Sequence, residues 1–69
     1  MYKYEIVLNW DKEENTYMAS VTELPGCIAN GPSYMEALFN IEIVIVQWLE
    51  AAKKLGKEIP KPKTDTNPD

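Results

Sequence analysis

The chain has 69 residues, which suffices for one small domain, and its 11 acidic residues outnumber its 7 lysines, so that the formal net charge is −4. With this acidic excess and no arginine, direct binding of nucleic acid is not expected, because phosphate backbones are contacted through clustered positive charge. The absence of histidine removes the commonest general base and the commonest metal ligand, so the sequence predicts neither a cofactor nor a bound metal.

The small size also indicates that a second chain contributes to stability. A domain of this length hides only about 60% of the surface that its unfolded chain exposes, and Cys27 has no second cysteine with which to form a disulfide. A lone thiol is typical of the reducing cytoplasm, and neither a signal peptide nor a membrane-spanning stretch is recognisable. We therefore expect a soluble cytoplasmic protein that associates with another polypeptide.

The first half of the chain predicts an antiparallel hairpin followed by a third strand. Residues 2–10 alternate in polarity, and residues 16–22 alternate again after a charged turn. Pro25 and Gly26 then turn the chain sharply, since proline lacks an amide hydrogen and glycine can adopt positive φ. Residues 27–29 are the predicted third strand. The face of the first strand predicted to be buried consists of Tyr2, Tyr4, Ile6, Leu8 and Trp10.

A single long helix is predicted next. Ser33 and Glu36 have the spacing of a capping box, in which each side chain satisfies a free amide of the other residue, so the helix should begin at Tyr34. It should end near Leu55, with Gly56 as the left-handed residue that follows. Two prolines keep residues 57–63 out of a helix, and we expect an extended arm or a short edge strand there, followed by a frayed end.

Apolar residues surround most of the middle of this helix. One stripe has the spacing of a face that packs on a sheet: Tyr34, Leu38, Ile41, Ile45, Trp48, Ala52 and Leu55. A second set lies on another side: Met35, Phe39, Ile43, Val46 and Leu49. Each large side chain left in water forgoes roughly 1.5–3 kcal/mol of burial, so the second set predicts an interface. Its occupant is open between the chain's own sheet and arm, a toxin, and a second copy of the chain, the last being the preferred interpretation.

Taken together, several of these features resemble the HicB family of type II toxin–antitoxin systems. The residues that carry the resemblance are Glu23-Leu24-Pro25-Gly26-Cys27, Ala29-Asn30-Gly31, Ser33 with Glu36-Ala37-Leu38, Trp48-Leu49, and Gly56 with Ile59-Pro60. The resemblance implies an α+β fold of three antiparallel strands, one long helix and a short last strand, a partly degraded RNase H-like unit. Residues 1–62 are accordingly assigned to one HicB-like domain and residues 63–69 to a flexible tail.

The resemblance also implies a function. Family members neutralise HicA, a small RNA-cleaving toxin, by covering its active site, and they commonly form dimers or tetramers. The chain is therefore expected to be a non-enzymatic antitoxin that binds a HicA-like RNase and copies of itself, with an acidic charge that suits a basic partner. The residues expected at protein interfaces are Met35, Phe39, Ile43, Val46 and Ile59. The residues expected to have structural roles are Pro25, Gly26, Gly31, Ser33, Glu36 and Gly56.

Other functions stay open. Many family members carry a C-terminal DNA-binding domain, and because this chain ends soon after Pro60, autorepression is not expected. An orphan member without a toxin would only assemble with itself. A magnesium-dependent nuclease of RNase H type would need clustered carboxylates, for which Glu5 and Glu36 are the nearest candidates. Glu5 is expected opposite the core and Glu36 in the helix cap, which argues against this function.

Overall fold

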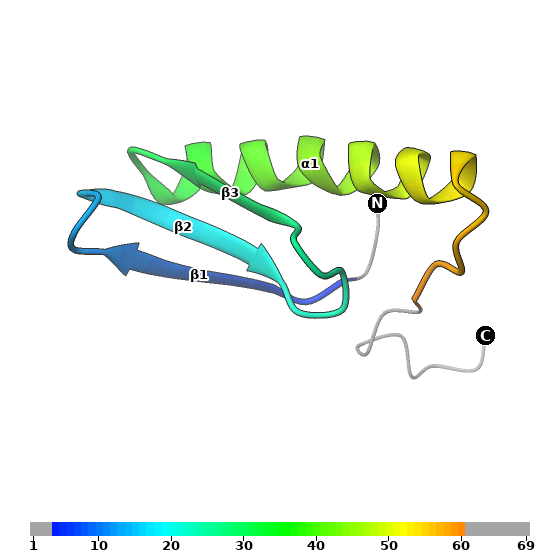
Figure 1. Cartoon of the computed structure of the whole chain (residues 1–69). Coiled ribbons are helices and arrows are strands. Elements are labelled where there is room, and N and C mark those ends of the chain that lie inside the picture. Colours follow the sequence, from blue (N-terminus) through cyan, green and yellow to red (C-terminus); the bar gives the residue numbers. More distant parts are fainter. Residues whose placement is uncertain (1–3, 61–69) are drawn as a thin grey trace, which may run out of the picture.

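The computed structural model of the protein describes residues 4–60, which form three strands followed by one helix. The strands are β1 (Ile6–Asp11), β2 (Thr16–Val21) and β3 (Ile28–Gly31), and the helix is α1 (Tyr34–Lys54). Figure 1 shows the helix running alongside β3, with β1 farthest from it. The predicted α+β fold is confirmed. Residues 57–60 form neither helix nor strand, and the rest of the predicted last strand lies outside the described residues.

The sheet is antiparallel and has the order β1-β2-β3. A four-residue turn joins the first two strands, in which Asp11 Oδ1 accepts hydrogen bonds from the amides of Glu13 at 3.1 Å and Glu14 at 3.2 Å. Asn15 closes the turn at a φ of 55°, a left-handed conformation that asparagine tolerates better than most residues. The charged residues that were predicted to form a turn therefore do form one. β1 begins at Ile6, later than predicted, although Tyr4 before it is buried, and Tyr2 lies outside the described residues. β3 begins one residue later and ends two residues later than the predicted third strand.

Both ends of α1 are capped near the predicted positions, but Glu36 Oε1 accepts a hydrogen bond from the Ser33 hydroxyl at 3.5 Å and not from the Ser33 amide as the capping box predicts. The Ser33 hydroxyl accepts a hydrogen bond from the Glu36 amide at 3.2 Å, which confirms the helix start. At the other end Gly56 has a φ of +70°, and the amide of Lys57 donates to the carbonyl of Ala52 at 2.9 Å. This is a Schellman motif, which satisfies carbonyl groups that the last turn leaves free.

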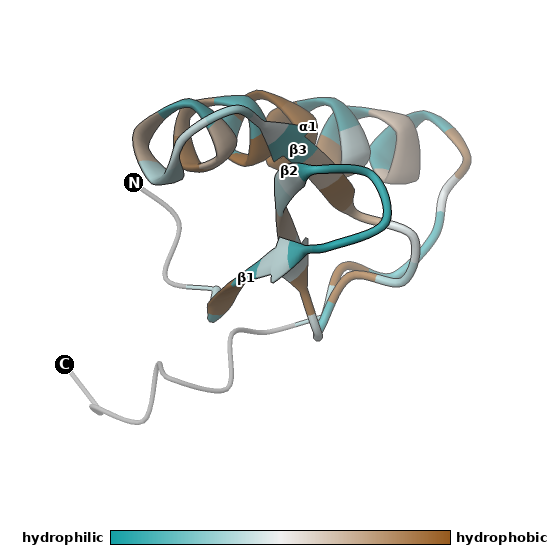
Figure 2. Cartoon of the chain, turned by 90° about the vertical axis from the view of Figure 1, so that its left-hand side faces the viewer, coloured by the Kyte–Doolittle hydropathy of each residue, from teal (hydrophilic) through white to brown (hydrophobic). Residues whose placement is uncertain are grey.

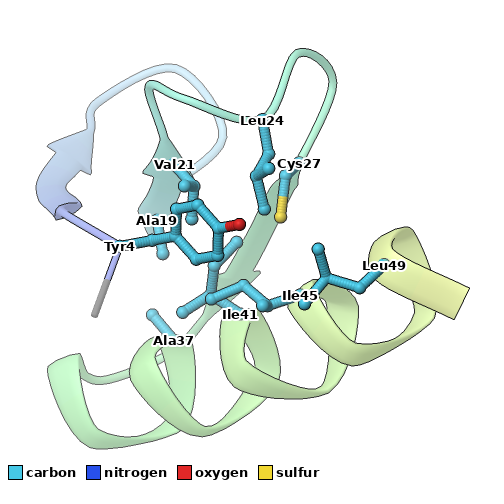
Figure 3. Close-up of a cluster of buried hydrophobic side chains, with 9 residues drawn as sticks. All are labelled: Tyr4, Ala19, Val21, Leu24, Cys27, Ala37, Ile41, Ile45 and Leu49. Atoms are coloured by element: carbon cyan, nitrogen blue, oxygen red, sulfur yellow. The ribbon is translucent and has the colours of Figure 1, made fainter. Parts of the chain in front are cut away.

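The core lies between the sheet and α1 and draws on every element (Figure 3). In that close-up Ile41 and Ile45 of the helix point toward the loop residues Leu24 and Cys27, which are almost completely buried. The buried hydrophobic residues are Tyr4, Ala19, Val21, Leu24, Cys27, Ala37, Ile41, Ile45, Leu49 and Ala52. Cys27 is therefore a small core residue.

The predicted core stripe of the helix was wrong at its two ends, since Tyr34 and Leu55 are exposed. A helix of 21 residues is about 31 Å long, whereas strands of six residues extend about 20 Å, and the C-terminal end of α1 projects beyond the sheet (Figure 1). Tyr34 lies at the hairpin end of the sheet, where it packs against Tyr17 and is otherwise uncovered. Leu49, predicted on the second face, is buried instead, and Ala37 was missed.

The prediction that Trp10 is buried was wrong: it lies on the inner face of β1 but at the hairpin end of the sheet, and is 48% exposed. Its ring packs edge-on against Tyr17, with 4.8 Å between centroids, and Tyr17 in turn packs against Tyr34 at 4.4 Å. Aromatic contacts of this kind contribute roughly 0.5–1.5 kcal/mol each beyond the area that they bury. They hold the hairpin end of the sheet to the start of the helix.

Candidate protein-binding surfaces

One exposed apolar surface lies on the side of α1 that faces away from the sheet. It consists of Met35, Phe39, Ile43 and Val46, which are 75%, 64%, 44% and 41% exposed, and is called the helix outer face below. These four residues recur every three or four positions, so they form one stripe. Four of the five residues predicted at interfaces thus lie together on one surface. Figure 2 shows brown, hydrophobic segments along α1 and in the strand layer beneath it.

Charged residues border the helix outer face. Glu36 lies in the first turn of α1 and Lys53 and Lys54 lie in the last, all three exposed. Glu42 and Glu50 lie close to the stripe, between the first and the last turn of the helix. Each end charge is opposite in sign to the partial charge of the helix terminus near it, which favours the helix itself.

A second exposed apolar surface lies on the opposite layer of the molecule. The register pairs Val7 with Ser20 and Ser20 with Ile28, so these three residues share the face of the sheet that points away from α1. Met18 is in the neighbouring row of the same face. We call Val7, Met18 and Ile28 the sheet outer face, of which Val7 and Ile28 are exposed. No interface was predicted on this face, although its residues alternate with the buried ones in each strand.

The fifth predicted interface residue, Ile59, is in a different environment. It is half-buried and packs against the core, and the Tyr4 hydroxyl donates a hydrogen bond to the carbonyl of its neighbour Pro60. A groove of about 400 Å³ opens beside it, lined by Pro25, Trp48, Ala51, Ala52, Leu55, Lys57, Glu58 and Pro60. Ile59 therefore presents less apolar surface than the four helix residues.

The residues predicted to be structural have identifiable roles at tight points of the chain. Gly26 adopts a φ of +80° in the turn after Pro25, and the Pro25 carbonyl accepts a hydrogen bond from Trp48 Nε1 at 2.8 Å. Gly31 lies against the first turns of α1, where a Cβ atom would approach the Ala37 amide nitrogen to 2.6 Å. The turn and the glycine fix the position of the helix on the sheet at its two ends.

The two candidate metal-binding carboxylates are not brought together. Glu5 precedes β1 at the Ile6–Val21 end of the sheet, whereas Glu36 lies beside Gly31, which pairs with Tyr17 at the other end. Four or five residues of strand separate these two ends, about 16 Å. Within residues 4–60 no group of three or more acidic, cysteine or histidine residues has the arrangement of a metal site.

Cys27 has no features of a reactive thiol. It is 1% exposed, and desolvation by burial raises the pKa of its thiol, so the neutral form is favoured. Reactive cysteines have the opposite shift, produced by nearby positive charge or a helix N-terminus.

Known proteins similar to this chain were identified by sequence. A family model described as HicB-like antitoxin of bacterial toxin–antitoxin system matches residues 4–67. A UPF0150 protein of Thermoplasma acidophilum is 37% identical over 59 residues, covering 86% of this chain and 84% of the relative. A UPF0150 protein of Helicobacter pylori is 49% identical over 39 residues, 56% of this chain and 54% of the relative. No solved structure shows significant similarity. Among residues 4–60 no helix is long and apolar enough to span a membrane.

Proposed function

Because the chain belongs to the HicB-like antitoxin family of bacterial toxin–antitoxin systems, we propose that it neutralises a HicA-type RNase toxin by binding it directly, and that it also associates with copies of itself. The observation that supports both parts is the pair of apolar surfaces on opposite layers of the fold. A small two-layer domain that buries one side of its helix and one side of its sheet leaves the other two sides available. Two partners can then be bound at the same time.

The sheet outer face is the proposed toxin-binding surface. Val7 and Ile28 provide exposed apolar area on a rigid sheet, and Asn9 and Asn30 in the next row add side chains that can form hydrogen bonds. A rigid platform binds with little loss of conformational entropy. The net charge of −4 favours encounter with a basic RNA-binding protein. The helix outer face is left for self-association.

An experiment with the toxin tests this proposal. The chain is co-expressed with the product of the neighbouring gene, which the proposal requires to be a small basic protein, and RNA cleavage by that product is measured with and without the chain. We expect a stable complex and loss of cleavage. Replacing Ile28 with Glu should weaken the complex 10- to 100-fold, since roughly 1.5–3 kcal/mol of apolar burial is lost. Gln47→Glu, which adds the same charge on the exposed side of α1, is the matched control.

Different results would redirect the proposal. If Ile28→Glu leaves the complex intact and Ile43→Glu destroys it, the toxin binds the helix outer face and not the sheet. If no complex forms and cleavage continues, the chain has no toxin-neutralising role and an orphan member that assembles only with itself is the better description.

A further inference from the structure

Two charged residues at the ends of the helix outer face lie symmetrically about its centre. Ile43 and Val46 are the two central residues of the stripe. Glu36 lies seven residues before Ile43, and Lys53 lies seven residues after Val46, so both charges are two helical turns from the centre. The sign differs between the two ends. The two ends of the helix are therefore complementary to those of a reversed copy, whereas Glu42 and Glu50 have the uncharged Gln47 and Phe39 at their mirrored positions.

From this symmetry we infer that two copies of the chain pack their helix outer faces together in antiparallel orientation, related by a two-fold axis that passes between Ile43 and Val46. This inference rests on the proposed self-association and specifies its geometry. Ile43 contacts Val46 of the partner subunit, and Glu36 lies opposite Lys53 of the partner subunit, each contact occurring twice. Phe39, four residues before Ile43, meets the methylene groups of Glu50 of the partner subunit, four residues after Val46.

A parallel arrangement of the same two faces is electrostatically unfavourable. It would place Glu36 beside Glu36 of the partner subunit and the lysines of the last turn beside their own copies. Like charges placed in contact reduce stability, whereas the antiparallel arrangement replaces two repulsive contacts with two attractive ones. It also places the partially positive start of each helix near the partially negative end of the other. The charges of this one helix are therefore sufficient to select an orientation.

The size of the helix outer face indicates how strong such a dimer is. Four exposed apolar side chains give an interface with less area than the roughly 800 Å² per partner of a standard stable complex. We therefore expect a dimer whose formation depends on protein concentration. Because its orientation depends on exposed charges, 0.5 M salt should weaken it several-fold.

Zero-length coupling of carboxylates to amines by a carbodiimide tests the orientation on the unmodified protein. In one helix Glu36 and Lys53 are 17 residues apart, about 25 Å, which is too far for direct coupling. A peptide that joins Glu36 to Lys53 or Lys54 must therefore come from two subunits. We expect this peptide in the dimer band by mass spectrometry. A mixture of ¹⁵N-labelled and unlabelled chains should yield it in mixed-isotope form.

The control variants separate the orientation from the association itself. The double variant Lys53→Gln, Lys54→Gln should lose the linked peptide and form a weaker dimer, whereas Lys12→Gln, in the hairpin turn, removes a lysine away from the interface and should change neither. A dimer in which Glu36 is not coupled to the last-turn lysines overturns the antiparallel orientation but leaves self-association standing. A single-subunit mass at every concentration overturns both the orientation and the self-association. If bound toxin covers the helix outer face, the proposal that a second copy of the chain occupies this face is overturned.

Discussion

Gly31 lies so close to the first turns of α1 that a Cβ atom attached to it would be 2.6 Å from the amide nitrogen of Ala37. It would also lie 2.8 Å from the carbonyl carbon of Glu36, and both obstacles are backbone atoms that cannot rotate away. The absence of a side chain lets β3 pack directly against the helix. Ala37 is itself completely buried at this contact.

The first prediction concerns this contact. Gly31→Ala should lower the free energy of unfolding by about 1–3 kcal/mol, because β3 and α1 must move apart to admit the methyl group. Urea denaturation followed by circular dichroism measures the change. Gly26→Asn is the matched control: Gly26 has a φ of +80° and open space around it, and asparagine tolerates that conformation. An unchanged urea midpoint for Gly31→Ala would contradict the close packing.

The second prediction concerns the hydrogen bond between Trp48 Nε1 and the carbonyl of Pro25. Trp48→Phe removes the donor and some of the ring, and we expect a loss of about 1 kcal/mol in the free energy of unfolding, since water can reach the exposed carbonyl in its place. The control is Trp10→Phe, which keeps an aromatic ring against Tyr17. Equal effects of the two variants would show that the bond from Trp48 adds nothing.

Local patterns were sufficient to predict the order of the three strands, the turns and both ends of the helix, although the bounds of β1 and β3 differ from the predicted ones. The capping residue Ser33 and the left-handed Gly56 determine the helix ends through hydrogen bonds a few residues away, and such bonds depend on neighbouring sequence alone. The second apolar set of the helix was also predicted, with four of its five members exposed.

The wrong predictions concern residues whose burial depends on the relative length and position of the helix and the sheet. Tyr34 and Leu55 have the spacing of core residues, but Leu55 follows the end of a helix that is longer than the sheet, and Tyr34 is covered only where it packs against Tyr17. Leu49 was assigned to the outer face, yet the helix is positioned so that it points into the core. The sheet outer face was overlooked because an apolar residue such as Ile28 in a four-residue strand gives too short an alternation to assign a side.

The third prediction concerns pH. The pKa of the Cys27 thiol is raised in the folded state by burial, so the unfolded chain loses this proton first as the pH rises. The stabilisation is complete below the ordinary thiol pKa of about 8.5 and decreases above it, by at most about 1.4 kcal/mol per pH unit. Urea denaturation under reducing conditions between pH 7 and 10 measures this decrease.

Comparison with Cys27→Ala isolates the thiol from the lysines and tyrosines that titrate in the same range. The variant should be less stable at pH 7, since a buried group is removed, and the difference between the two proteins should diminish toward pH 10. A difference that stays constant over the whole range would mean that the thiol is as accessible in the folded chain as in the unfolded one.

The fourth prediction distinguishes the two apolar surfaces. Ile43→Glu places a charge at the centre of the helix outer face in both subunits, so roughly 1.5–3 kcal/mol of burial is lost twice and the dimer dissociation constant should rise at least about 100-fold. Sedimentation equilibrium over a range of concentrations measures this constant. Ala51→Glu introduces the same charge at an exposed position of the same helix outside the helix outer face, and should leave the constant within a few-fold of that of the unmodified protein. Because the helix and sheet outer faces lie on opposite layers, Ile43→Glu should not alter toxin inhibition, and Ile28→Glu should not alter the dimer. If either variant abolished both activities while the chain stayed folded by circular dichroism, the two partners could not occupy separate faces, and toxin binding would instead require the assembled dimer.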